Sequence, residues 1–432
     1  MLPRPTNAQL RPGVAAGPIT TALVAGLPAE GYRIELAETG IRIEAADDAG
    51  LFYAAQTLEQ LGEHPPLGSI EDHPRFAYRG AMLDVARHFF SVADVTRYID
   101  DIARLKLNHL HLHLTDDQGW RIAIDAYPRL TEVGGATQVG GGGGGWYSKE
   151  DYRAIVEHAA SRFVTIVPEV DMPGHTNAAI VAYPELGDEP ATAYEGIEVG
   201  FSSLAIGRPT TYVFVETVLR ELAAMTPGPY LHLGGDESLA TTDEDFLAFI
   251  ARATALGATT GKRLIGWHEM GRSRELPPGT IGQYWDYRVP REHAAEHTRS
   301  FVEQGGRVIM SPADVAYLDI KPTADSPLGL TWADGPTSVR DAYEWDPADI
   351  VPGVGDEQLL GVEAPLWTET ITSIDEIEEM AFPRLAAIAE IAWSPRGERD
   401  FVEFADRLAV LERQWDALGI RFHRAAEVSW LD

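Results

Sequence analysis

The feature that most constrains the fold of this 432-residue chain is a regular alternation of short apolar runs and amphipathic helices after residue 74. Eight runs have the length and composition of buried strands, and they cover residues 81–85, 109–114, 165–170, 230–233, 263–267, 280–285, 307–310 and 359–364. Helical patterns cover residues 91–106, 149–162, 210–225, 243–255, 292–304 and 373–393. This order predicts an α/β fold, a closed (β/α)8 TIM barrel, with a doubly wound open sheet as the alternative.

Two segments interrupt the regular pattern. Residues 271–279 are too short and too rich in proline for a helix, so we expect the barrel to lack a regular fifth helix. Residues 320–357 are also a poor match to a regular helix.

The first 73 residues have a different character. Residues 31–44 alternate apolar and polar side chains on both sides of the turn Glu38-Thr39-Gly40, which predicts a β-hairpin. Residues 50–61 carry apolar side chains on one helical face. We therefore predict a small α+β domain over residues 1–73 and a catalytic barrel over residues 74–432.

Composition excludes several classes of protein. The chain has no cysteine, which rules out disulfides, thiolate metal sites and cysteine nucleophiles. Its formal charge of −31 argues against nucleic acid or an anionic membrane as a partner. No apolar stretch reaches membrane-spanning length, and the N-terminus lacks a signal-peptide core. We expect a protein that is cytoplasmic, or secreted with its leader absent from this chain.

Polar and aromatic residues follow every predicted barrel strand at its C-terminal end, where TIM barrels carry their chemistry. In strand order they are Asp84 and Arg87-His88; Thr115 to Gln118; Glu169, Asp171 and His175; Asp236-Glu237; Trp267-His268-Glu269; Tyr284-Trp285-Asp286; Tyr317 and Asp319; and Trp367 and Glu369. Sugar rings stack on indoles, and carboxylates and arginine bind their hydroxyls. The pattern therefore predicts a carbohydrate site.

Asp236 and Glu237 are consecutive, which narrows the chemistry. Most glycosidases place two carboxyls on opposite sides of the scissile bond, ~5–5.5 Å apart when they retain configuration and ~6.5–9.5 Å apart when they invert it. Neighbouring residues cannot easily straddle a sugar in this way. They suit a reaction in which one carboxyl is the acid and the other assists a nucleophile that the substrate carries, such as a 2-acetamido group.

Several segments of the chain resemble glycoside hydrolase family 20, the β-N-acetylhexosaminidases. The matching segments run in family order and are 79–89 (RGAMLDVARHF), 111–120 (HLHLTDDQGW), 168–176 (PEVDMPGHT), 232–237 (HLGGDE), 266–268, 283–285, 317–319 and 363–370 (EAPLWTET). Residues 31–61 also resemble the small domain that precedes the barrel in this family. With at most 73 residues, that domain is expected to be shortened and to lack its first strands.

The resemblance implies a role for each matching residue. Glu237 is the general acid and base, Asp236 orients the 2-acetamido group, and Tyr317 donates to its carbonyl oxygen. Asp116 and His175 form a relay behind Glu237. The substrate-binding residues implied are Arg87, Asp319 and Glu369 for hydroxyls, Trp267, Trp285 and Trp367 around the acetamido methyl, and Trp332 facing the leaving sugar.

The implied activity is exo-hydrolysis, with retention, of terminal β-linked N-acetylglucosamine or N-acetylgalactosamine through an oxazolinium ion, without cofactor or metal. The partner expected is a small carbohydrate; the preferred epimer, the linkage and the oligomeric state stay open. One alternative is a conventional retaining glycosidase with Asp319 or Glu369 as nucleophile. Others are a metal-dependent amidohydrolase using His111, His113 and His175, and a non-catalytic sugar-binding barrel.

Overall fold

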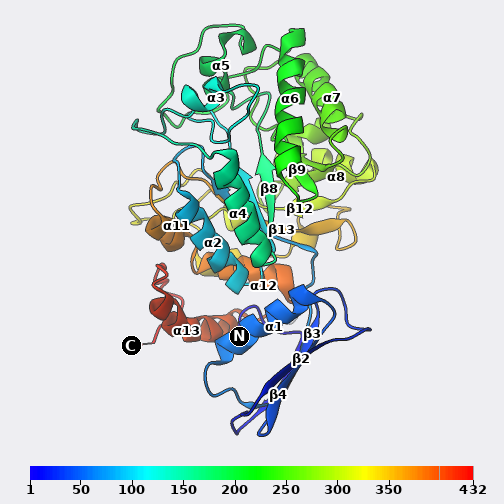
Figure 1. Cartoon of the computed structure of the whole chain (residues 1–432), viewed down its shortest axis with the longest axis vertical. Coiled ribbons are helices and arrows are strands. Elements are labelled where there is room, and N and C mark those ends of the chain that lie inside the picture. Colours follow the sequence, from blue (N-terminus) through cyan, green and yellow to red (C-terminus); the bar gives the residue numbers. More distant parts are fainter. Residues whose placement is uncertain (398, 432) are drawn as a thin grey trace.

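A closed barrel of parallel strands forms the larger part of the structure, a computed structural model that describes residues 1–397 and 399–431 (Figure 1). Its strands are β6 (Tyr78–Asp84), β7 (His109–His113), β8 (Thr165–Glu169), β9 (Tyr230–His232), β10 (Arg263–Trp267), β11 (Ile281–Tyr284), β12 (Val308–Met310) and β13 (Leu359–Leu366). The barrel closes because β13 pairs in parallel with β6. This confirms the predicted TIM barrel and excludes the open sheet.

Helices cover the outside of the barrel. The longer ones are α2 (Val92–Arg104), α4 (Lys149–Ser161), α6 (Pro209–Met225), α7 (Asp243–Ala258), α8 (Ala294–Glu303), α11 (Ile374–Ala381), α12 (Arg384–Trp393) and α13 (Phe401–Leu418). Short helices are α3 (Arg129–Glu132), α5 (Asn177–Ala182), η1 (Pro184–Leu186), α9 (Ala313–Ala316), α10 (Val339–Tyr343) and η3 (Pro347–Asp349). Helix α2 begins with a reciprocal capping box between Ser91 and Asp94 and buries Val95, Ile99 and Ile102. None of the helices in the described residues is long and apolar enough to cross the bilayer.

The predicted absence of a regular fifth helix is confirmed. Between β10 and β11 the described chain forms only the short 3-10 helix η2 (His268–Arg272). Helix α8 packs directly against η2, and a Cβ on Gly271 would lie 2.0 Å from the carbonyl oxygen of His297. The space that a fifth helix would occupy is therefore taken by this close contact.

Near the C-terminus one helix prediction was wrong, and one helix was not predicted. Residues 373–393 form two helices, α11 and α12, rather than one, because Pro383 cannot donate a backbone hydrogen bond and restricts the residue before it. Helix α13 was missed, although Asp400 caps its N-terminus and Gly419, with φ of 69°, ends it.

The N-terminal unit is a five-stranded sheet with the order β1-β5-β3-β4-β2. Its elements are β1 (Asn7–Arg11), β2 (Ile19–Leu23), β3 (Tyr32–Ala37), β4 (Gly40–Ala45), α1 (Asp48–Leu61) and β5 (Leu67–Asp72). The expectation that strands before the hairpin are missing is therefore wrong. Every residue of β1 and β2 is exposed, so these edge strands leave no apolar alternation in the sequence.

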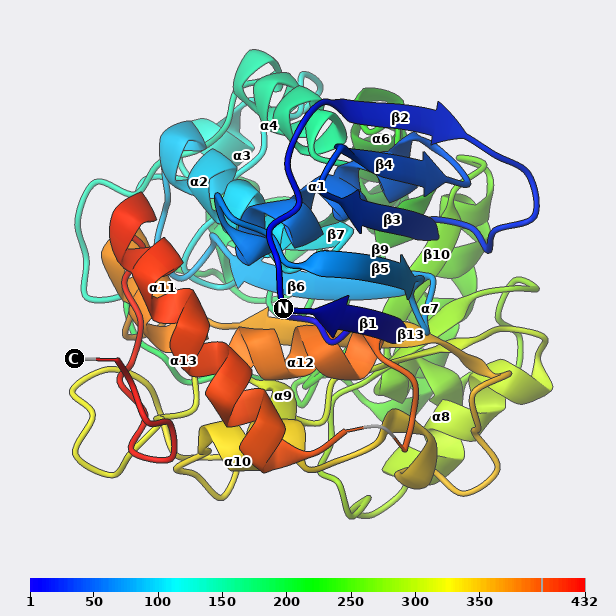
Figure 2. The same cartoon turned by 90° about the horizontal axis from the view of Figure 1, so that it is seen from below.

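Figure 2 shows the N-terminal strands side by side in the order β2, β4, β3, β5 and β1. Asp72, the last residue of β5, joins this sheet to the barrel. Its carboxylate accepts hydrogen bonds from Trp393 Nε1 at 2.9 Å, Lys106 Nζ at 3.0 Å and the Tyr32 hydroxyl at 2.5 Å. All four side chains are buried, so the ion pair is shielded from solvent and fully hydrogen-bonded. A domain boundary at residue 73, directly after this contact, stays a prediction.

Candidate active site

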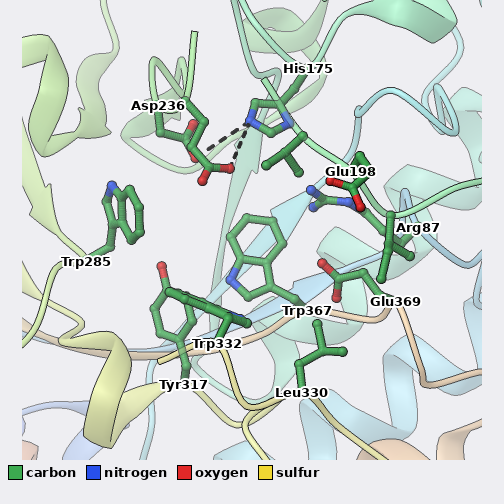
Figure 3. Close-up of a pocket in the computed structure, with 13 residues that line it drawn as sticks. Arg87, His175, Glu198, Asp236, Trp285, Tyr317, Leu330, Trp332, Trp367 and Glu369 are labelled. Atoms are coloured by element: carbon green, nitrogen blue, oxygen red, sulfur yellow. Dashed lines mark ion pairs between the residues drawn. The ribbon is translucent and has the colours of Figure 1, made fainter. Parts of the chain in front are cut away.

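A pocket of about 320 Å³ lies at the C-terminal ends of the barrel strands (Figure 3). The residues predicted for the site that line it are Arg87, His175, Asp236, Glu237, Trp285, Tyr317, Trp332, Trp367 and Glu369. The other predicted residues, Asp116, Trp267 and Asp319, are buried and are not part of the lining. The barrel thus gathers side chains from six different strand ends around one cavity.

Asp236 and Glu237 reach the pocket through a tight turn after β9. Gly234, with φ of 67°, lies so close to Asp171 that a Cβ would be 1.7 Å from Asp171 Oδ1. The N–H of Gly235 donates to the same oxygen at 2.9 Å. Glu237 itself has φ of 41°, a conformation that non-glycine residues rarely adopt and that is concentrated at functional sites. The two glycines are therefore what allows both acids to point into the cavity.

His175 lies against both of these acids. Its Nε2 is 3.7 Å from Glu237 Oε2 and 3.9 Å from Asp236 Oδ2, and its Nδ1 is 3.2 Å from Asp116 Oδ1. Burial alone would lower the pKa of His175, but the charges of Asp116 and Asp171 outweigh it and raise that pKa well above its ordinary value. Burial, and then the charge of Asp236, raises the pKa of Glu237 to about 7. Glu237 can therefore hold a proton near neutral pH.

Arg87 is the arginine of the pocket lining and is only 3% exposed. Its Nη2 is 2.9 Å from Asp116 Oδ2, and its guanidinium lies 4.8 Å from the centre of the Trp367 ring. Nε and Nη1 have no hydrogen-bond partner in the part of the chain that the structure describes, although Nη1 lies 3.5 Å from Asp84 Oδ2. These donors are positioned to bind hydroxyls of a ligand.

Aromatic side chains form a wall of the pocket. Tyr317 lies with its ring centre 5.6 Å from that of Trp332 and 6.3 Å from that of Trp367, and Trp285 lies 6.3 Å from Trp332. Trp332 is 44% exposed at the mouth. Trp267 is fully buried, 6.1 Å from Trp367, with its indole N–H bonded to Glu169.

Two further acids are the buried Asp319 and the half-buried Glu369, whose charge acts on Arg87. Neither oxygen of Asp319 has a hydrogen-bond partner among the described residues. Burial, and then the charge of Glu369, raises the pKa of Asp319 to about 8; burial also raises the pKa of Glu369. Asp319 thus retains a proton near neutrality and can donate as well as accept hydrogen bonds.

The family model described as "Glycosyl hydrolase family 20, catalytic domain" matches residues 76–245 and 238–396, and that of domain 2 of the same family matches residues 3–73. The chain belongs to glycosyl hydrolase family 20. It is therefore a glycoside hydrolase, as the motifs predicted.

Known proteins of the family are similar over nearly the whole chain. A β-N-acetylhexosaminidase of Cellulomonas fimi is 44% identical over 99% of this chain and 87% of its own length. The structure of Streptomyces plicatus N-acetyl-β-hexosaminidase in complex with Thio-NAglucal has a TM-score of 0.96 and 42% identity, covering 100% of this chain and 97% of the other. The family 20 β-N-acetylhexosaminidase of Streptomyces coelicolor A3(2) has a TM-score of 0.95 and 41% identity, covering 100% and 98%.

Some lining residues of this family 20 enzyme were not predicted. Ile197, Glu198 and Val199 come from the irregular loop before α6, and Leu330 from the loop before β13. The first loop is held in place by Gln118 Nε2, which donates to the carbonyl of Gly196 at 2.9 Å. Both segments lie far along the connections that follow β8 and β12, so a search of the strand ends does not reach them. The exposure of apolar residues such as Ile197 would indicate them, but exposure is not readable from sequence.

The metal-dependent alternative for this family 20 enzyme is not supported by the positions of its histidines. Groups of acidic and histidine side chains close enough to share an ion occur in the described barrel, but none contains two of His111, His113 and His175. Instead these rings lie against carboxylates: His111 against Glu169 and Glu363, His113 against Glu169 and Asp116, and His175 against Asp116. His111 and His113 are thus hydrogen-bonded within the protein, which favours a packed role for these two.

Proposed function

We propose that this enzyme removes terminal β-linked N-acetylglucosamine or N-acetylgalactosamine with retention, using the acetamido oxygen of the sugar as the nucleophile. The observation that carries the proposal is that Asp236 and Glu237 both approach Nε2 of His175, at 3.9 and 3.7 Å. The two carboxyls therefore lie on the same side of the pocket and cannot flank a sugar from opposite faces. A nucleophile supplied by the substrate removes the need for a second carboxyl opposite the acid.

In the first step, Glu237 donates its proton to the leaving oxygen while the acetamido carbonyl oxygen attacks the anomeric carbon. The C–O bond to the leaving group breaks and an oxazolinium ion forms. Asp236 accepts a hydrogen bond from the acetamido N–H and balances the positive charge that develops on the ring. The Tyr317 hydroxyl donates to the carbonyl oxygen, and Trp285 and Trp367 enclose the methyl group, with Trp267 beneath them.

In the second step, Glu237, now ionised, takes a proton from a water molecule that attacks the anomeric carbon. The oxazolinium opens, the acetamido group is restored, and the product keeps the β configuration. A pKa of about 7 for Glu237 suits a group that must both give and accept a proton near neutral pH.

The size of the pocket supports exo action. Its volume of about 320 Å³ is at the lower end of the range for small-molecule sites, which fits one sugar rather than a chain of sugars. Arg87, whose Nε and Nη1 make no hydrogen bond among the described residues, the protonated Asp319, and Glu369 are suited to bind the hydroxyls of that terminal sugar. Trp332, exposed at the mouth, is placed to contact the leaving sugar.

The relatives support the same substrate class. The Streptomyces plicatus enzyme is seen in complex with Thio-NAglucal, and the Cellulomonas fimi protein is a β-N-acetylhexosaminidase. The conventional two-carboxylate route is less suited to this chain. Its nucleophile would be Asp319 or Glu369, and a nucleophile must be ionised. Burial and the charge of Glu369 raise the pKa of Asp319 to about 8, and burial raises the pKa of Glu369 above its ordinary value, so both shifts disfavour the ionised form.

The deciding experiment compares aryl β-N-acetylglucosaminide and N-acetylgalactosaminide with the matching 2-hydroxyl glycosides, and follows the anomer first released from N-acetylated oligosaccharides by NMR. We expect cleavage of the acetamido sugars alone, a β product, and strong inhibition by a thiazoline that mimics the oxazolinium. Equal hydrolysis of 2-hydroxyl sugars, or an α product, would disprove the proposal.

A further inference from the structure

His113 lies beneath the pocket between two carboxylates. It is fully buried on β7, its Nε2 is 2.8 Å from Asp116 Oδ2, and its Nδ1 is 2.5 Å from Glu169 Oε2. An ionised carboxylate only accepts hydrogen bonds. Both ring nitrogens must therefore carry a proton, which makes His113 an imidazolium that bridges the two acids.

Glu169 is held in the ionised form, because burial is outweighed by the charge of His113, which keeps the pKa of Glu169 well below its ordinary value. Its Oε1 accepts a hydrogen bond from Trp267 Nε1 at 2.9 Å and lies 3.0 Å from His232 Nδ1, and its Oε2 lies 3.1 Å from His111 Nε2. All of these side chains are fully buried. Interactions between charges in such an enclosed site are screened far less than at the surface.

Asp116 connects His113 to the reacting groups. One oxygen, Oδ2, is shared by His113 Nε2 and Arg87 Nη2, at 2.8 and 2.9 Å, and the other faces His175 Nδ1 at 3.2 Å. A line of contacts therefore runs from Glu169 through His113, Asp116 and His175 to Glu237. The backbone N–H of Asp117 also donates to Oδ1, at 2.5 Å. Of the three side chains that contact the Asp116 carboxylate, only His113 comes from within a barrel strand rather than a loop.

We propose that the buried His113–Glu169 ion pair is a positioning device that fixes Asp116 against His175 and sets the pH at which Glu237 gives up its proton. Neither residue lines the pocket, so both act through Asp116 and His175 rather than on the substrate. The inference rests on the proposed function only in taking Glu237 as the acid.

The charges around these groups define what a substitution should do. The groups that face His113 directly are Glu169 and Asp116, with Asp171 across Glu169. The groups that face Asp116 and Glu169 are Arg87, His175, His111 and His232. The charges that act on Glu237 are those of Asp236, His175, Arg87 and Asp116. Removing the positive charge of His113 makes Glu237 hold its proton more tightly. Removing the negative charge of Glu169, with His113 still paired to Asp116, does the opposite.

The test is the pH profile of kcat/KM for His113→Gln, Glu169→Gln and the double variant. We expect the basic limb to move to higher pH in H113Q and to lower pH in E169Q, each by on the order of half a pH unit, and to return close to the wild-type position in the double variant. We also expect kcat to fall about tenfold in each single variant, with a smaller change in KM, because Asp116 loses its support but the lining is intact. Limbs that stay in place, or move in the same direction, would overturn the inference.

His109→Gln is the matched control. His109 is a buried histidine on the same strand, and burial lowers its pKa to about 3, so the substitution removes no charge. It should cost stability as H113Q does and leave the limb unmoved; a shift as large as that of H113Q would indicate structural damage instead.

Two further arms separate the possible failures. If wild-type enzyme does not cleave an aryl N-acetylhexosaminide, the proposed function fails, whereas an active wild type with unmoved limbs counts against the ion pair alone. Where the single variants do not fold, neutron diffraction from wild-type crystals near pH 7 decides the question. Deuterium on both ring nitrogens of His113 is expected, and deuterium on only one would overturn the proposal.

Discussion

Trp285 donates its indole N–H to the carboxyl group of Glu269, with Nε1 3.1 Å from Oε1 and 2.9 Å from Oε2. The two residues follow the neighbouring strands β11 and β10. Glu269 is not in the pocket lining, yet its hydrogen bond orients one aromatic wall of the cavity. The wall that we assign to the acetamido methyl therefore depends on a residue that the substrate does not touch.

Glu269→Leu should weaken binding of N-acetylated substrates. The change leaves a partly buried indole N–H without an acceptor, which costs about 1–3 kcal/mol, and the freed ring can turn out of the wall. We expect KM for an aryl N-acetylglucosaminide to rise about five- to tenfold with a smaller change in kcat. Glu269→Gln keeps an acceptor of the same shape and serves as control; equal KM values for the two variants would contradict this role.

Glu237→Gln should abolish acid catalysis while leaving the fold intact. We expect kcat to fall about 10²- to 10⁴-fold with oligosaccharides, whose leaving groups need a proton, and much less with activated aryl leaving groups in the glycosylation step. Steady-state kinetics across a series of leaving groups measures this difference. A uniform loss with every leaving group would show that Glu237 is not the acid.

The pH profile of the wild-type enzyme should follow the raised pKa of Glu237. Because burial and Asp236 raise that pKa to about 7, Glu237 stays protonated below neutrality and loses its proton as the pH rises through 7. The value of kcat/KM should therefore decline on the alkaline side with a midpoint near pH 7. A plateau extending to pH 9 would place the acid elsewhere.

Asp236→Asn should impair reactions of the acetamido group specifically. The amide cannot balance the positive charge of the oxazolinium, so we expect kcat/KM on N-acetylated substrates to fall by about two orders of magnitude or more. Inhibition by a thiazoline analogue should weaken in parallel, because the same charge is recognised. Activity that falls while thiazoline affinity stays at the wild-type level would argue against this role.

Asp319→Asn should change how stability depends on pH. The pKa of Asp319 is about 8 in the folded protein and about 3.9 in an unfolded chain, so between these values only the unfolded state is ionised. A raised carboxyl pKa means that the free energy of unfolding is lost as the pH rises from about 4 to about 8. The Tm of the variant relative to wild type should therefore increase from pH 5 to pH 9, with weaker substrate binding. A Tm difference that is constant with pH would contradict the buried, protonated Asp319.

The fold was largely readable from the chain where elements are buried. The barrel strands show as apolar runs because both of their faces are covered, and the missing fifth helix shows as the proline-rich segment 271–279. The edge strands β1 and β2 were not readable, since all of their side chains face solvent. The apolar pattern of residues 373–393 continues across Pro383, although this proline divides the run into two helices.

The candidate site was readable only in part. Strand-end motifs identified Arg87, Asp236 and Glu237, because parallel pairing brings all the C-terminal ends to one face. The segment 197–199 was not found, since a loop reaches the pocket only through long-range contacts such as that of Gln118 with Gly196.

Sequence alone settles which chemical groups stand at the mouth of the barrel, because alternation along a strand and parallel pairing are local, repetitive rules. Tertiary structure alone decides which of those groups meet the cavity and in which protonation state. Trp267 turns beneath the lining to bond Glu169, and Asp319 keeps a proton near neutrality, because burial and neighbouring charge depend on residues more than forty positions away. Proton affinity is set by the sum of those distant fields and by exclusion of water, and both exist only once the barrel has closed.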